Sequence, residues 1–191
     1  YDNLNRCVRK VLPGCLYIKY VYDNADRMTF SQDGNQRTKG LWTYYLYDKL
    51  GRLTEQGECV DKNTSSGGKT VLVKNHYDNY NFVGSNGFTN TCFTKDTSGY
   101  GKGRLTGCEM SVLGSTAKLY AAYYYNVKGL NIKTVEGNLL GGHDVTTTTY
   151  TFTGNPATVT HTHTASGKPS CTETYTYTYD HKDRVSKVEH T

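Results

Sequence analysis

The chain has 191 residues, a formal net charge of +5 and a mean hydropathy of −0.67. A chain of this length can form one large domain or a run of small units, and it holds no apolar stretch near the roughly eighteen residues that a membrane span requires. The charge is mild and no dense basic block occurs, so the composition favours an ordinary solvated surface over nucleic-acid binding.

The composition predicts an all-β fold. Only 36% of the residues are hydrophobic, but 18 are Tyr, which can bury its ring while its hydroxyl stays hydrated. Residues with a high strand preference dominate, and only three prolines interrupt them. No segment of useful length has the apolar period of a helix. We therefore expect an array of antiparallel β-hairpins that forms one curved, elongated sheet.

In chain order, the first predicted strand covers residues 16–22, where apolar and polar residues alternate after the turn signal Pro13-Gly14. A second strand covers residues 42–47, and Asp33-Gly34-Asn35 is the expected hairpin tip between the two. The polar stretch 61–69 is expected to be an extended hairpin loop, because strand-forming residues resume directly after it.

The second half of the chain begins irregularly and ends as almost pure strand. Glycines crowd residues 84–103, so we expect a distorted repeat or a surface excursion there. From Thr146 onward, Thr-rich runs alternate with Tyr, which places Tyr on one face of the sheet and Thr on the other.

An eight-residue motif, Tyr47-Asp48-Lys49-Leu50-Gly51-Arg52-Leu53-Thr54, recurs along these strands. Clear copies start at Tyr1, Tyr22, Tyr47 and Tyr179, weaker ones at Tyr77 and Tyr125, a truncated one is Gly103-Arg104-Leu105-Thr106, and a very worn one starts at Phe152. The spacing predicts a single array over residues 1–191, with about eight units of about 25 residues, each long enough for two strands and their connections.

The motif itself predicts a tight turn between two strands. Its fifth position holds Gly, Asn or Asp, the residues that accept a positive φ most easily; these are Asn5, Asp26, Gly51, Asn81, Gly129 and Asp183. Asp at the second position favours the start of a type I turn. The Phe152 copy does not fit, because Pro156 stands at its fifth position and cannot take a positive φ.

The residues to which we assign this structural role are the recurring Tyr, Asp, Gly and Arg of the motif: Tyr1, Asp2, Arg6, Tyr22, Asp23, Arg27, Tyr47, Asp48, Gly51, Arg52, Tyr77, Asp78, Tyr125, Gly129, Tyr179, Asp180 and Arg184. The arginines are expected to pack on neighbouring tyrosines or to bond carboxylates and carbonyls around the turns, because a residue that recurs in every unit serves the unit. An anion-binding row of arginines is the alternative interpretation.

Repeated Tyr-Asp-x-x-Gly-Arg-Leu-Thr resembles the YD repeats of the bacterial Rhs and toxin-complex proteins, most clearly at residues 1–10, 22–31, 47–56 and 179–188. The resemblance implies a long β-hairpin ribbon that spirals into a hollow shell, often around a toxin domain encoded at the C-terminus. Because the chain starts on a motif residue and ends shortly after the last motif, we expect it to be a fragment of a longer array.

Catalytic motifs are not evident in the sequence. It contains no nucleophile elbow, phosphate-binding loop or metalloprotease motif, so we assign no catalytic residue and expect no enzyme. The self-cleaving Asp-Pro-x-Gly-type site that the resemblance would imply does not occur, because the prolines follow Leu12, Asn155 and Lys168.

Histidine and cysteine residues offer two further possibilities. His161 and His163 share one face of a predicted strand and could hold a metal with a third ligand from a neighbouring strand, but nothing in the sequence fixes that ligand, so no metal or other cofactor is expected. The six cysteines include no Cys-x-x-Cys pair and are expected to be small buried apolar residues. Cys7 and Cys15 are the one pair that a nearby turn brings within reach of a disulfide.

The resemblance to YD repeats, together with the lack of catalytic motifs, implies a non-catalytic wall segment of a secreted or cell-surface bacterial protein, which helps to enclose or display a C-terminal toxin or effector domain. Its partners would be the rest of the repeat shell and the enclosed domain, with neither nucleic acid nor a membrane span. The alternative is a carbohydrate- or cell-surface-binding module in which the exposed aromatic rings of Tyr17, Trp42 and Tyr44 stack on glycans.

Overall fold

The computed structural model describes residues 1–62, 68–85 and 87–191. Their fold is all-β and antiparallel, as predicted, and the strand order in the sheet is the order in the chain. The described strands are β1 (Arg9–Lys10), β2 (Ile18–Tyr22), β3 (Met28–Gln32), β4 (Trp42–Tyr47), β5 (Leu53–Cys59), β6 (Lys69–Tyr77), β7 (Leu105–Ser111), β8 (Lys118–Tyr125), β9 (Asn131–Gly137), β10 (His143–Tyr150), β11 (Pro156–His163), β12 (Cys171–Tyr179) and β13 (Val185–His190).

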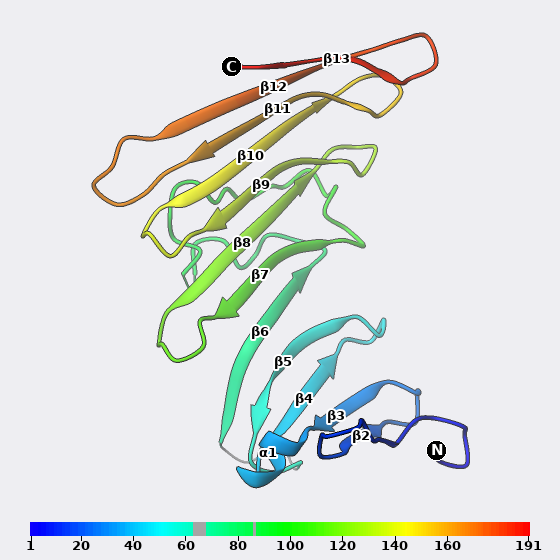
Figure 1. Cartoon of the computed structure of the whole chain (residues 1–191). Helices are drawn as coiled ribbons and strands as arrows, with labels where there is room; N and C mark the ends of the chain where they lie inside the picture. The colour runs from blue at the N-terminus through cyan, green and yellow to red at the C-terminus, as the bar shows by residue number, and fades with distance from the viewer. Residues whose placement is uncertain (63–67, 86) are drawn as a thin grey trace. The chain divides into compact units, whose positions relative to one another are not determined.

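The chain divides into two compact units, residues 1–74 and residues 75–191. Within each unit, strands that follow one another in sequence pair with one another (Figure 1). Part of the polar loop predicted at residues 61–69, namely residues 63–67, lies outside the described residues. The strand predicted at residues 42–47 coincides with β4.

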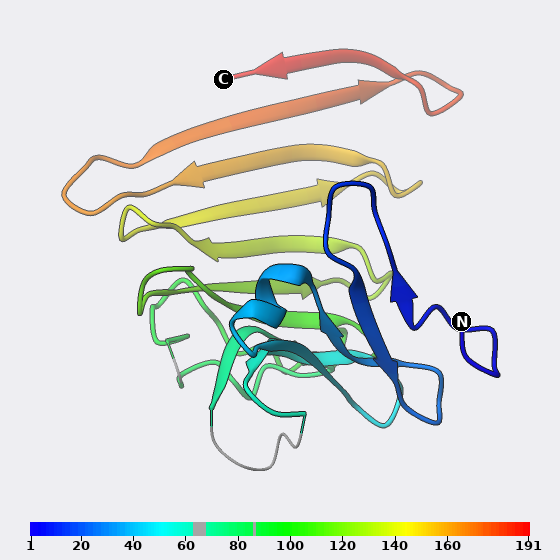
Figure 2. The ribbon, with the colours of Figure 1, turned by 60° about the horizontal axis from the view of Figure 1, so that its bottom comes forward.

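Unit 1 contains a short helix where the sequence predicted only a hairpin tip. Helix α1 (Gly34–Thr38) connects β3 and β4 (Figure 2). The Asp33 side chain caps it by accepting a hydrogen bond from the Gln36 N–H at 2.7 Å, and the Gln36 side chain accepts one from the Asp33 N–H at 3.2 Å. This reciprocal capping box satisfies two N–H groups that a helix start leaves unpaired, so one helical turn replaces the simple turn.

Each motif hairpin carries the same irregularity in its strand pairing. The register shifts immediately before the motif tyrosine, between Val21 and Tyr22, between Leu46 and Tyr47, and between Tyr124 and Tyr125. The same shift occurs before Tyr150 and before Tyr179. A β-bulge of this kind increases the local twist and changes the direction in which the next side chain points. The repeat is therefore defined by its strand pairing as well as by its turn.

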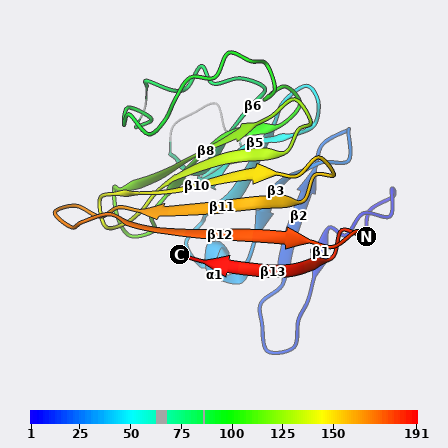
Figure 3. The same cartoon turned by 90° about the horizontal axis from the view of Figure 1, so that it is seen from above.

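In unit 2, the irregular segment forms a layer over one face of the sheet. Residues 79–102 leave the sheet after β6 and return before β7, and Figure 3 shows their loops on one side of strands β8 to β10. Their aromatic rings pack against the strands in one buried cluster: Tyr80, Phe82, Phe88, Phe93, Ala122, Tyr124 and Val135. The segment is thus a surface excursion, one of the two forms predicted, and it brings aliphatic and aromatic burial to an otherwise polar sheet.

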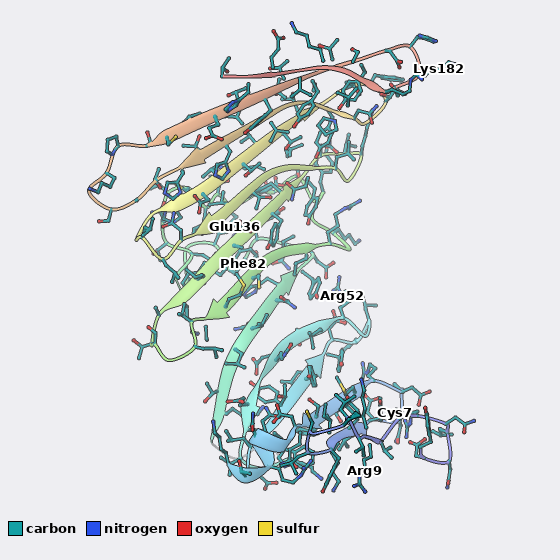
Figure 4. All side chains as sticks on the ribbon, in the orientation of Figure 1. Cys7, Arg9, Arg52, Phe82, Glu136 and Lys182 are labelled. Atoms are coloured by element: carbon teal, nitrogen blue, oxygen red, sulfur yellow. The ribbon has the colours of Figure 1, made fainter. Side chains whose placement is uncertain are left out.

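The rings of this cluster fit closely against one another and against the strand backbone. The Phe82 and Phe88 ring centroids are 4.6 Å apart, and those of Tyr80 and Tyr124 are 5.0 Å apart in a stacked pair. A Cβ atom on Gly107 of β7 would lie 2.4 Å from the Phe82 ring, which Figure 4 labels, so glycine is needed for this approach.

No helix in the described part of the chain is long and apolar enough to span a membrane.

Candidate functional site

The repeated turn is built by the aspartate at its second position. Asp48 accepts hydrogen bonds through Oδ1 from the backbone N–H groups of Leu50 and Arg52, both at 2.9 Å. Its Oδ2 lies 2.7 Å from Nε of Arg52. Equivalent bonds join Asp2 to Arg6, Asp23 to Arg27 and Asp180 to Arg184.

The fifth position of the turn has the left-handed backbone that the sequence predicts in five copies: φ is 59° at Asn5, 59° at Asp26, 80° at Gly51, 78° at Gly129 and 57° at Asp183. A Cβ atom at position 129 would meet the Arg104 guanidinium at 2.0 Å, so a side chain there would displace that flexible group. Asn and Asp tolerate this conformation because their short polar side chains can bond locally.

The charges of the turn shift the pKa of its carboxylates. The backbone N–H of Arg52 holds the pKa of Asp48 below its ordinary value, and the Arg52 and Leu50 contacts reinforce the effect against partial desolvation. The pKa of Asp180 is lowered mainly by the Arg184 side chain. These carboxylates are consequently held in the ionised form, which accepts hydrogen bonds but does not deliver a proton.

The motif tyrosine links each repeat to the one before it. Its hydroxyl donates a hydrogen bond to the backbone carbonyl of the residue that follows the sixth motif position of the preceding repeat. These bonds are Tyr22 to Cys7 at 3.0 Å, Tyr47 to Met28 at 2.8 Å, Tyr125 to Leu105 at 2.7 Å, Tyr150 to Asn131 at 2.6 Å and Tyr179 to Pro156 at 2.7 Å. We refer to them as the inter-repeat tyrosine bonds.

The motif arginine makes the reciprocal contact with the repeat that follows. Arg6 donates through Nη1 to the Asp23 carbonyl at 3.0 Å, and its Cζ lies 5.1 Å from the centroid of the Tyr22 ring. Arg27 has the same relation to the next repeat, with its Cζ 5.1 Å from the Tyr47 ring centroid. Where the sixth motif position is Arg, as at Arg6 and Arg27, the junction therefore combines a tyrosine–carbonyl bond with a cation–π contact.

One turn is divided by the excursion, and here the predicted assignment was wrong. Tyr77-Asp78 and Gly103-Arg104 were taken as two worn copies, with Asn81 as a left-handed residue. Asn81 does not have a positive φ, whereas Asp78 (72°) and Gly103 (79°) do. The Gly103 N–H donates to Asp78 Oδ1 at 2.7 Å, and the Asp78 N–H donates to the Arg104 carbonyl at 3.1 Å. The two halves form a single motif turn, with residues 79–102 inserted between them.

The threonine at the last motif position makes the same hydrogen bond in the divided turn as in uninterrupted copies. The hydroxyl of this residue bonds the carbonyl before the motif tyrosine: Thr29 to Val21 at 3.3 Å and Thr54 to Leu46 at 3.2 Å. Thr106 makes the same bond to His76 at 3.1 Å across the insertion.

The worn copy assigned to Phe152 actually begins two residues earlier. The Thr151 N–H donates to the Asn155 carbonyl at 2.8 Å, and Gly154 has φ of 94°. Tyr150 therefore holds the motif tyrosine position, as its bulge and its inter-repeat bond also show. This register moves Pro156 out of the turn and into the first position of β11, which a proline can occupy. Phe152 is left 92% exposed at the turn.

Of the three aromatic residues predicted to stack on glycans, one is buried and two are half-buried. Tyr44 is fully buried, so it is not an exposed platform. The Tyr17 ring has the Cζ atoms of Arg9 and Arg37 at 4.1 and 3.6 Å from its centroid. Trp42 has Lys62 Nζ at 4.3 Å from its ring and the edge-on ring of Phe30 at 6.5 Å. Cationic groups thus occupy ring surface that a sugar would need.

A groove in unit 2 lies between the excursion and strands β8 and β9. Its volume is about 460 Å³, and its lining includes Asp96, Tyr100, Tyr124 and Lys133. Two of these groups already have partners: Lys133 Nζ donates to the Cys92 carbonyl at 3.3 Å, and the Tyr124 hydroxyl accepts from the Thr94 N–H at 2.8 Å. The polar groups of the groove therefore fasten the excursion to the sheet.

The cysteines are free thiols, so Cys7 and Cys15 do not form the disulfide considered from the sequence. Cys59 and Cys108 are buried, as expected of small apolar residues, whereas Cys15 and Cys171 are exposed. Burial raises the pKa of the Cys59 and Cys108 thiols.

Comparison with known proteins gives structural similarity only. No protein-family model and no curated protein sequence matches the chain. The chain is similar to a crystal structure of TcdB2–TccC3 at 13% identity with a TM-score of 0.47, and to the same assembly without the hypervariable C-terminal region at 15% and 0.45. It is also similar to TcdB2–TccC3–Cdc42 at 15% and 0.44. Each match covers 92% of this chain and 9% of the other chain.

Proposed function

We propose that this chain is a non-catalytic wall segment of a secreted or cell-surface bacterial protein of the Rhs and YD-repeat type. In this role it helps to enclose or display a C-terminal toxin or effector domain, and its partners are the remaining repeats of the shell and the enclosed domain. The observation that carries the proposal is the set of inter-repeat tyrosine bonds, which join one repeat to the next in the same way along the chain.

These contacts suit a wall because they join neighbouring repeats at recurring positions. Five motif tyrosines bond the preceding repeat, and Arg6 and Arg27 also bond the repeat that follows. Architectures in which each unit contacts only its neighbours gain stability from such interfaces and can be extended by adding units. In the described residues, antiparallel ladders also join successive strands, and their backbone hydrogen bonds hold neighbouring strands together.

The proposed absence of catalysis has its own support in the turns. The recurring Asp and Arg side chains, which are the residue types that often act on substrates, bind one another and the backbone of their own turn. Mechanistically, the segment would act as a barrier that keeps the enclosed domain from solvent and proteases.

The experiment is limited proteolysis of the full-length protein that carries this segment. We expect its C-terminal domain to resist protease until the wall is weakened, for example by the combined substitutions Tyr22→Phe, Tyr47→Phe and Tyr125→Phe. Tyr100→Phe is the matched control, because Tyr100 is 41% exposed and is not a motif tyrosine. A C-terminal domain that is cleaved equally fast in the wild type and the triple variant would contradict an enclosing role. Turnover of ester, glycoside or phosphodiester substrates by the purified segment would contradict the non-catalytic role.

A further inference from the structure

Strands β10, β11 and β12 bring two histidines and their neighbours to one face of the sheet in unit 2. On β11, His161 and His163 are two residues apart, so both side chains point to the same face. The register places Thr146 and Asp144 of β10 directly opposite them on one flank. On the other flank, Glu173 of β12 lies opposite His161, and Cys171 lies opposite His163.

Side chains of β10 contact one nitrogen of each imidazole ring. His161 Nδ1 lies 3.1 Å from Thr146 Oγ1, and His163 Nδ1 makes a close contact with Asp144 Oδ1. In the described residues, neither Nε2 atom has a hydrogen-bond partner. Metal-binding histidines almost always have this arrangement, in which a carboxylate or another oxygen fixes one ring nitrogen and leaves the other for the metal.

The β12 flank supplies two further donor types within reach. Side chains directly opposite on antiparallel strands have Cβ atoms about 4.5–5.5 Å apart, so the Cys171 and Glu173 side chains lie beside the two imidazoles. Cys171 is an exposed free thiol. Glu173 has only loose contacts, with Oε2 at 3.9 Å from His190 Nε2 and 3.5 Å from the Tyr175 hydroxyl. Both side chains can therefore turn toward the histidines at little cost.

We propose that His161, His163, Cys171 and Glu173 bind a divalent transition metal, with Zn²⁺ as the preferred ion. Two imidazoles, one thiolate and one carboxylate are ligands that tetrahedral Zn²⁺ takes, and the thiolate disfavours the hard ions Mg²⁺ and Ca²⁺. Asp144 and Thr146 orient the two rings. No three His, Cys, Asp or Glu side chains in the described ranges are already gathered around one point, so the β12 side chains complete the site on binding. The Cys171 thiol releases its proton when its sulfur binds the metal.

The site is independent of the repeat contacts. None of its four ligands belongs to a motif turn, and its residues lie on strands whose pairing does not depend on a metal. The metal would cross-link β11 to β12, so it would raise the midpoint of thermal unfolding.

Calorimetric titration of the tag-free chain with Zn²⁺ tests the proposal. We expect one equivalent to bind, and His161→Ala or His163→Ala to weaken binding at least tenfold. His181→Ala is the matched control, because it removes an exposed histidine of the last turn and should leave the affinity unchanged. Asp144→Asn should weaken binding roughly 10- to 100-fold, although it removes no metal ligand.

Two further measurements make the ligand set falsifiable. Co²⁺ in place of Zn²⁺ should give the absorption of a tetrahedral site with a sulfur-to-metal charge-transfer band, and Cys171→Ser should abolish that band. Circular dichroism shows whether each variant retains its strands. Binding that is absent in the wild type, or that stays equally tight in both histidine variants or in Cys171→Ser/Glu173→Gln, would overturn the proposal.

Discussion

Among single residues, the aspartate of the motif turn has the most definite electrostatic role. The Arg52 contacts lower the pKa of Asp48 from its ordinary value of 3.8. The unfolded chain binds the proton more tightly, so the carboxylate adds stability that is present above pH 3.8 and is lost as the pH falls through the folded pKa.

We therefore expect Asp48→Asn to lower the free energy of unfolding at pH 7, and we expect the difference from wild type to shrink progressively below pH 3.8. Asparagine can still accept the two backbone hydrogen bonds, so the substitution isolates the charge. Urea denaturation at pH 7, 4 and 3 measures the effect. A difference that does not change with pH would show that the ion pair with Arg52 contributes nothing.

The inter-repeat tyrosine bond permits an equally local prediction. Tyr47→Phe removes the hydroxyl that bonds the Met28 carbonyl at 2.8 Å and keeps the ring in place. We expect a loss of about 1 kcal/mol in the free energy of unfolding, the usual net value of such a hydrogen bond. Tyr1→Phe, at a ring that is 86% exposed, should change it by less than about 0.5 kcal/mol. Equal effects of the two substitutions would contradict a special role for the bond.

For single residues, the sequence predicts much of the backbone conformation of the motif turn. Small polar residues and glycine at the fifth motif position indicated positive φ correctly in the clear copies, because that conformation excludes most other side chains. The partners of the tyrosine hydroxyls could not be predicted, since they depend on the bulge that precedes each motif and on the register of the neighbouring repeat. Tyr150 could have been found, because Gly154 stands at the fifth position counted from it.

Among the elements, the excursion at residues 79–102 supplies four aromatic side chains to the buried cluster of unit 2. Phe88 is completely buried in its centre and contacts Phe82, Phe93 and Tyr120. Phe88→Ala should therefore cost about 3–5 kcal/mol, as is usual for a large aromatic residue in a packed core. The matched control is Phe152→Ala at a ring that is 92% exposed, for which we expect less than about 0.5 kcal/mol.

Thermal or urea unfolding of both variants measures the two values. A small effect of Phe88→Ala would mean that the excursion is only loosely attached to the strands beneath it. The less drastic Phe88→Leu serves if the alanine variant does not fold, and it should destabilise the chain more than Phe152→Ala does.

The excursion shows where prediction of the elements fails. Tyr77-Asp78 lacks the second half of the motif, and Gly103-Arg104 lacks the first half, so the two incomplete copies are complementary. Their separation of more than twenty residues hides this in any search for a fixed period. Helix α1 was also missed, although Asp33 and Gln36 have the spacing of a capping box.

For the whole molecule, the reactivity of the six cysteine thiols is a useful measure of folding. We expect Cys15 and Cys171 to react quickly with a thiol reagent in the native chain, because both are exposed. Cys59 and Cys108 should react only on unfolding, because they are buried and their thiol pKa values are raised. Six reactive thiols in denaturant, with or without prior reduction, would agree with six free cysteines. A total of four without reduction would reveal a disulfide.

The divided turn has a consequence for how chains of this kind can change in length. The Asp78 N–H donates to the Arg104 carbonyl, as the Asp48 N–H does to the Arg52 carbonyl in an uninterrupted copy, and the Gly103 N–H donates to Asp78 Oδ1. These bonds close the turn although residues 79–102 lie between its two halves. A motif turn is therefore a point at which foreign sequence can be accepted without a shift in pairing, and a peptide grafted there would be displayed at a defined position on the ribbon.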